Sequence, residues 1–89
     1  MKLNENFVLK TVAGSAVVMP VGEAVTKVHG MIKLNPTAEI IWKALEAGKD
    51  FDGIVQALKD SCNGVDEAML KEDVAVFLEK LRSYGILED

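Results

Sequence analysis

The sequence predicts an α+β fold in which a three-stranded antiparallel sheet precedes three helices. Up to Leu34, apolar and β-branched residues come in short runs separated by Gly and Pro, which is typical of strands and turns. After Pro36, apolar residues recur at three- and four-residue spacing, which is typical of amphipathic helices. The stretch Leu34–Trp42 joins the two halves, and the rest of the chain is organised around it.

The first two predicted strands form a hairpin. They span about residues 6–12 and 15–20, and Ala13 and Gly14 form the short turn between them. The sequence does not define the type of this turn. A third strand is predicted at about residues 31–34, and as the last strand of a small meander it leaves one edge unpaired.

The segment between the second and third strands is the least regular part of the chain. Its glycines, Gly22 and Gly30, indicate a loop or a bulge. Residues 24–28 within it fit either a short strand or a helical turn.

Helix boundaries are marked by capping residues. Asn35 is predicted to cap a helix over residues 36–47, because its side chain can accept a hydrogen bond from a free backbone N–H. Pro36 suits the first helical position, and Gly48 suits a left-handed C-cap. The apolar stripe of this helix contains Ala38, Ile41, Trp42 and Leu45.

Two further helices follow the same logic. Asp50 is the expected N-cap of a helix over residues 51–62, and Asp66 is that of a helix over residues 67–84. The expected inward faces comprise Phe51, Ile54, Val55 and Leu58 in the former helix and Leu70, Val74, Phe77, Leu78 and Leu81 in the latter. Ile86 and Leu87 would return as a tail or a very short strand.

Three short helices joined by tight turns, with a small sheet packed on them, resemble a winged-helix arrangement. The whole chain, residues 1–89, is expected to be one domain, and its 49% hydrophobic content supports a folded core. No apolar run approaches the roughly 18 residues that cross a bilayer, so no membrane partner is expected. The N-terminus lacks an apolar signal core and Cys62 is the single cysteine, which together favour the cytoplasm.

Candidate catalytic groups are few. His29 is the only histidine, and no histidine lies near Cys62 in sequence to activate its thiol. One Cys and one His do not make a zinc site, and the glycines form no phosphate-binding pattern. Trp42 falls on an apolar stripe and is expected in the core. We therefore expect no catalytic residue, no metal and no cofactor.

The helical half of the chain is acidic. Of the net charge of −4, residues 1–34 contribute +2 and residues 35–89 contribute −6. A DNA-reading helix usually presents Arg, Lys, Asn or Gln near its start, whereas the predicted last helix begins with Asp66 and Glu67. Nucleic acid is therefore not expected as a partner, and a winged-helix DNA-binding transcription regulator is kept as the alternative.

The favoured prediction is recognition of a peptide. An open strand edge can accept an extended peptide as an added strand. On the last helix, one stripe beside the core stripe shares a face at i, i+4, i+7 and i+11. The stripe would offer an apolar floor between two positive rims, and it contains Lys71, Ala75, Leu78 and Arg82.

The order and spacing of several segments together resemble the PqqD family, the pyrroloquinoline quinone synthesis protein D-like proteins. The segments are the hairpin, the junction Gly30–Ala38, the pair Ile41-Trp42 and an ending with Glu72-Asp73-Val74, Phe77-Leu78, Leu81 and Gly85-Ile86-Leu87. The resemblance covers nearly the whole chain. Pro36 departs from the usual Leu-Asn-Glu-Thr junction by replacing Glu, which leaves the capping logic intact.

The resemblance implies a non-catalytic recognition element for ribosomally made, post-translationally modified peptides. Such proteins hold the leader of a precursor peptide and present it to a modifying enzyme, often a radical S-adenosylmethionine enzyme. The leader pairs antiparallel to the third strand, which implies backbone contacts at Met31, Ile32, Lys33 and Leu34. Family members serve several pathways, so quinone synthesis itself is not implied. An interaction domain of an enzyme complex without peptide cargo stays open, as do a monomer and a homodimer.

Overall fold

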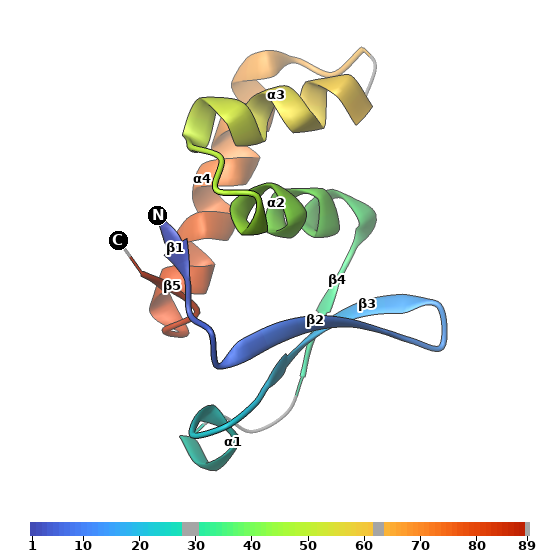
Figure 1. Ribbon diagram of the computed structural model, residues 1–89. Coiled ribbons are helices and arrows are strands. Elements are labelled where there is room, and N and C mark those ends of the chain that lie inside the picture. Colours follow the sequence, from blue (N-terminus) through green and yellow to red (C-terminus); the bar gives the residue numbers. More distant parts are fainter. Residues whose placement is uncertain (28–30, 62–63, 89) are drawn as a thin grey trace.

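The computed structural model describes residues 1–27, 31–61 and 64–88 (Figure 1). In these residues it has two small antiparallel sheets and four helices. The elements in chain order are β1 (Lys2–Leu3), β2 (Phe7–Val12), β3 (Ser15–Pro20), α1 (Ala24–Lys27), β4 (Ile32–Leu34), α2 (Pro36–Glu46), α3 (Phe51–Ser61), α4 (Glu67–Ser83) and β5 (Leu87–Glu88).

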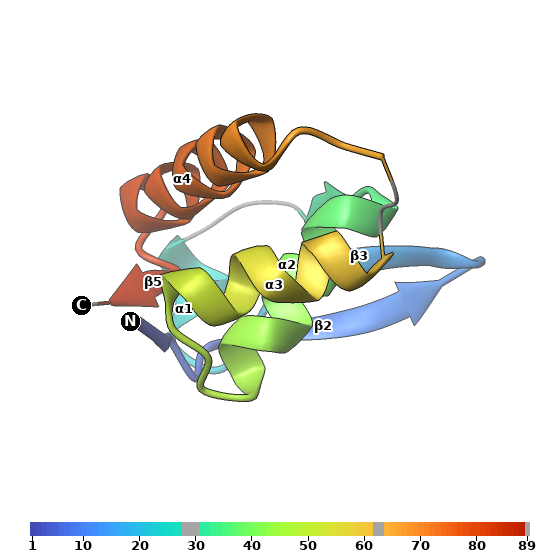
Figure 2. The ribbon, with the colours of Figure 1, turned by 90° about the horizontal axis from the view of Figure 1, so that it is seen from above.

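The predicted fold class is confirmed. A three-stranded antiparallel sheet with the order β2-β3-β4 precedes the three longer helices α2, α3 and α4. Of the two interpretations of residues 24–28, the helical turn is correct over the described residues, because α1 occupies Ala24–Lys27. Seen from above, α4 lies on one side of the molecule and β2 on the other, with β3 between them (Figure 2).

The hairpin turn has two residues with left-handed backbone. The φ angle is 52° at Ala13 and 80° at Gly14. Positive φ at both central residues is the signature of a type I′ turn, whose twist matches that of the two strands. The turn directly joins the paired residues Val12 and Ser15 and so sets the register of β2 on β3.

The capping predictions around α2 are confirmed. Asn35 has extended backbone, and its Oδ1 accepts a hydrogen bond from the N–H of Ala38 at 2.8 Å. At the other end Gly48 has φ of 80°. The N–H of Gly48 donates to the Leu45 carbonyl and the N–H of Lys49 to the Ala44 carbonyl, which is the Schellman pattern. A strand therefore runs into a well-terminated helix without a loop.

The other two helices begin as predicted. Oδ1 of Asp50 accepts from the N–H of Gly53, and Oδ1 of Asp66 accepts from the N–H of Ala68, both at 2.9 Å. Each carboxylate satisfies a backbone donor that has no partner within the helix and lies at the positive end of the helix dipole.

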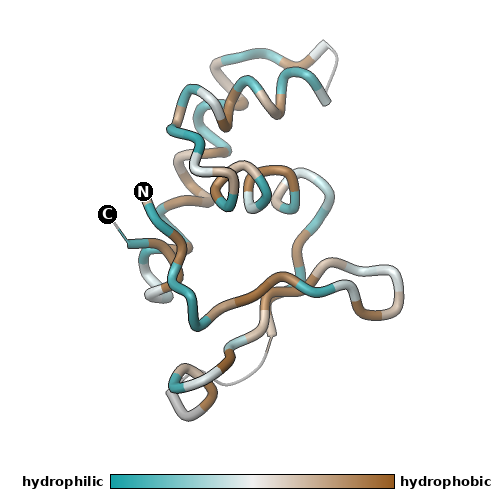
Figure 3. The backbone as a smooth tube through the Cα atoms, in the orientation of Figure 1, coloured by the Kyte–Doolittle hydropathy of each residue, from teal (hydrophilic) through white to brown (hydrophobic). Residues whose placement is uncertain are grey.

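One hydrophobic core joins the inner face of the sheet to the three longer helices. Apolar segments of β2, β3 and α2 face each other across it (Figure 3). Trp42 is 1% exposed, which confirms its predicted core position, although its indole N–H has no hydrogen-bond partner among the described residues. The fully buried large side chains are Trp42, Ile41, Ile54, Leu58, Leu81, Ile86, Val18 and Val74.

The chain termini meet in a second sheet, which consists of β1 and β5. The sequence analysis did not predict β1. Residues of β1 and β5 pair antiparallel, with Leu3 opposite Leu87. Asn4 extends this closure: its backbone N–H donates to the Ile86 carbonyl at 2.7 Å and its Nδ2 donates to the Gly85 carbonyl at 3.1 Å. Its Oδ1 accepts from the N–H of Asn6 at 2.9 Å. Of the two residues predicted to form a tail or a very short strand, Leu87 lies in the strand β5, and Ile86 directly precedes it.

We expect Asn4→Ala to lower the free energy of unfolding by about 1 kcal/mol, because two side-chain hydrogen bonds are lost. Asn4→Asp keeps the acceptor for the Asn6 N–H but places a carboxylate oxygen beside the Gly85 carbonyl at the end of α4, so it should cost at least as much. Urea unfolding followed by circular dichroism measures both variants. Equal stability of the alanine variant and the wild type would show that the Asn4 side chain does not hold the termini together.

Candidate functional site

β4 is an edge strand within the described residues. It pairs with β3 on one side, with Val18 opposite Ile32, Val17 opposite Lys33 and Ala16 opposite Leu34. No described strand pairs with its other side. Because β3 separates β4 from β2, this open side faces the part of the molecule that holds α4 (Figures 1 and 2).

The hairpin turn determines which backbone groups point to the open side. In a two-residue hairpin, the flanking pair Val12 and Ser15 exchanges hydrogen bonds, and the pattern then alternates along the strand. The end of the hairpin opposite the turn follows the same alternation of hydrogen-bonded pairs, since the N–H of Val21 donates to the Asn6 carbonyl at 2.7 Å. Along β3, Ser15 and Val17 therefore bond toward β2, whereas Ala16 and Val18 bond toward β4.

It follows that Ile32 and Leu34 use their backbone N–H and C=O groups to bond β3. Lys33, between them, directs its N–H and C=O to the open side. The resemblance implied backbone contacts at all of Met31–Leu34. By the strand phase, the contact at Lys33 is the one that an added strand on the open side would use, and the contacts at Ile32 and Leu34 stay a prediction. Met31 precedes the strand and is 58% exposed.

Side chains of β4 alternate between the two faces of the sheet. Leu34 is buried in the core and Ile32 packs against it half-buried, so both point inward toward the helices. Lys33 is exposed on the outer face.

A cavity of about 320 Å³ lies between the start of α2 and the middle of α4. It begins at Asn35, the residue after β4, and includes Ala38 and Ile41 from α2 and Asp73 and Phe77 from α4. Phe77 is half-buried, and its ring is the largest apolar side chain in the lining. The open edge and an apolar hollow therefore lie next to each other.

The stripe on the last helix that the sequence pattern favoured for peptide contact lies on the other flank of α4. With 100° between successive residues, Phe77 and Asp73 lie on one side of the buried stripe and Lys71, Ala75 and Arg82 on the opposite side. Leu78 is 2% exposed and belongs to the core, so the expectation that it offers an accessible apolar floor is wrong. Arg82 is half-buried, and its Nη1 lies 3.3 Å from Oε2 of Glu79.

The sequence analysis did not identify the flank of α4 that lines the cavity, because the spacing of its apolar residue is nearly the same as that of the core stripe. The spacing pattern places Phe77 on the buried face, which it borders, and gives no signal that sets Asp73 apart from the other acidic residues of the helix. The same flank continues to Tyr84, which is 50% exposed. Tyr84 lines a second hollow of about 350 Å³ with Phe7, Ala24 and residues of the N-terminal closure.

Of the other residues discussed from sequence, His29 and Cys62 lie outside the described residues. Within residues 1–27, 31–61 and 64–88, no group of three or more His, Cys, Asp or Glu is placed to bind a metal ion.

None of the described helices combines the length and apolar character of a membrane span. The N-terminus of α4 carries the exposed cap Asp66 and the exposed first residue Glu67, and both would repel a DNA backbone.

Comparison with known proteins agrees with this architecture. The solved structure of "TbiB1 in Complex with the TbiA(beta) Leader Peptide" is similar with a TM-score of 0.81 at 25% sequence identity, covering 99% of this chain and 95% of that one. No curated protein matches the sequence. Residues 14–87 match the family described as Coenzyme PQQ synthesis protein D (PqqD). Because this match spans most of the chain, the protein belongs to the PqqD family.

Proposed function

We propose that the protein is a non-catalytic chaperone for the leader of a ribosomally made precursor peptide. It binds the leader as an added strand on the open side of β4 and presents the rest of the precursor to a modifying enzyme, such as a radical S-adenosylmethionine enzyme, in the cytoplasm. The family membership and the leader peptide bound by the similar structure support this proposal.

The observation that carries the proposal is the outward direction of the Lys33 backbone. A guest residue opposite Lys33 can exchange two hydrogen bonds with it, each worth about 0.5–1.5 kcal/mol net. These bonds do not depend on the guest side chain, so they suit a role in which the peptide is held without chemistry. Affinity beyond this requires side-chain burial.

The cavity beside α4 provides that burial. An apolar guest side chain placed near Ala38 and Phe77 would cover the exposed part of the ring, and complete burial of a Leu-sized side chain contributes about 1.5–3 kcal/mol. We therefore propose Met31, Lys33, Ala38 and Phe77 as contact residues. Lys71, Ala75 and Arg82 remain proposed contacts only if the guest also reaches the opposite flank of α4.

Lys33→Pro tests strand addition. Proline is tolerated on an edge strand when its missing N–H faces outward, so we expect a folded variant whose affinity for the leader peptide encoded beside the gene falls about two- to tenfold. Titration calorimetry measures the affinity.

Two controls accompany this variant. Lys33→Ala removes the same side chain but keeps the N–H, so it separates the backbone bond from the charge. Ile32→Pro removes an N–H that bonds β3 and should destabilise the sheet. If the folded Lys33→Pro variant binds as well as Lys33→Ala, the peptide does not add as a strand at β4.

Ala38→Phe tests the cavity. The larger side chain would fill the hollow beside Phe77, and we expect about a tenfold loss of leader affinity, equivalent to about 1.4 kcal/mol. Ala75→Phe is the matched control, because it adds the same group to the exposed opposite flank of α4. Amide shifts in a titration with labelled protein locate the contact. The reverse result, with loss only in Ala75→Phe, would place the peptide on the flank that the sequence pattern favoured.

A further inference from the structure

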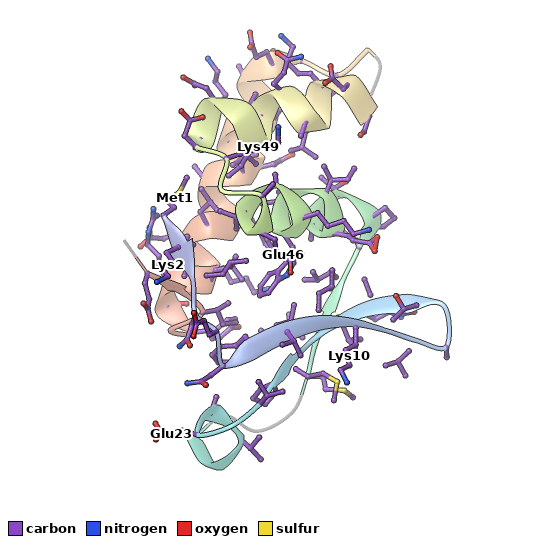
Figure 4. The ribbon with its side chains drawn as sticks, in the orientation of Figure 1. Met1, Lys2, Lys10, Glu23, Glu46 and Lys49 are labelled. Atoms are coloured by element: carbon purple, nitrogen blue, oxygen red, sulfur yellow. The ribbon has the colours of Figure 1, made fainter. Side chains whose placement is uncertain are left out.

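The face of the sheet turned away from α2 carries a basic row. The register aligns Lys10 of β2, Val17 of β3 and Lys33 of β4 side by side across the three strands. In Figure 4 the side chain of Lys10 projects from the hairpin on the side away from α2. Val17 is 7% exposed but is not part of the core cluster, as expected for a residue on this outer face.

The positive charge of this row is not balanced within the described part of the chain. The ion pairs found there join Lys43 to Glu39, Lys59 to Glu67 and Arg82 to Glu79, and none involves Lys10 or Lys33. Both lysines are exposed. Lys33 lies at the open end of the row, so a strand added to β4 would extend the row by one residue.

We infer that the guest peptide carries an acidic side chain directly opposite Lys33, with an apolar residue on each side of it. This inference rests on the proposed strand addition at β4. Residues directly opposite each other on neighbouring strands have side chains on the same face with Cβ atoms about 4.5–5.5 Å apart, so a guest Asp or Glu would pair with the Lys33 ammonium. The alternation of faces holds for a parallel and for an antiparallel guest.

The two flanking guest residues point to the inner face. There they meet the side chains of Ile32 and Leu34, and the cavity lined by Ala38 and Phe77 lies beside them. Asp73 also lines that cavity, so an acid moved by one position would be turned from Lys33 toward a carboxylate. The site therefore selects an alternating pattern of apolar, acidic and apolar residues.

Selection from a phage-displayed library of random dodecapeptides tests the inference with wild type, Lys33→Glu and Lys10→Glu. Wild type should enrich peptides with one Asp or Glu between two apolar residues, and Lys33→Glu should enrich Lys or Arg at that position with unchanged apolar neighbours. Lys10 is on β2, two strands away from the guest peptide's side of β4. Lys10→Glu should therefore enrich the same peptides as wild type. For a selected peptide, we expect Lys33→Glu to weaken binding about fivefold, and moving the acid by one residue to weaken it further.

The outcomes separate this inference from the proposed function. Two results would overturn the inference and leave peptide binding in place. In the first, peptides enriched on wild type shift the amides of residues 31–34 but carry no acidic residue. In the second, peptides enriched on Lys33→Glu still carry the acidic residue. A switch of preference with Lys10→Glu as strong as that with Lys33→Glu would also overturn it, because the preference would then come from the general field of the face. Failure to enrich any peptide would contradict strand addition itself and the inference with it.

Discussion

The two-residue turn at Ala13 and Gly14 determines the direction of every backbone hydrogen bond in the three-stranded sheet. Its left-handed φ angles make Val12 and Ser15 a hydrogen-bonded pair, and the alternation then passes through β3 to β4. Two strands away, it leaves Lys33 as the residue of β4 whose N–H and C=O face outward.

The second constraint is the direct passage from β4 into α2. Asn35 caps the helix with its own side chain, so no loop separates the edge strand from the first helical turn. The cavity beside that turn therefore starts where the open edge ends. A guest peptide would gain affinity from backbone bonds and from side-chain burial. The adjacent segments β4 and α2 supply these together with one flank of α4.

Burial by the core decides which surfaces of α4 remain for recognition. Leu70, Val74, Leu78 and Leu81 are all buried against the other helices, and this stripe divides the helix into two flanks. Only the flank with Asp73 and Phe77 lines the cavity beside α2. The pairing of β1 with β5 and the bonds of Asn4 fix the end of α4 against the N-terminal segment, which helps to hold that flank in place.

Local sequence was enough to predict the hairpin, the caps at Asn35, Asp50 and Asp66 and the buried stripes, because each depends on neighbouring residues or on a regular period. The resemblance to the PqqD family was also readable from residue order. The structure decided the outward direction of Lys33, the flank of α4 that borders the cavity and the pairing of β1 with β5. Hydrogen-bond phase depends on turn dihedral angles, and the partner of a helix flank or of a two-residue strand depends on segments distant in sequence. Periodicity identifies a face but not what lies opposite it.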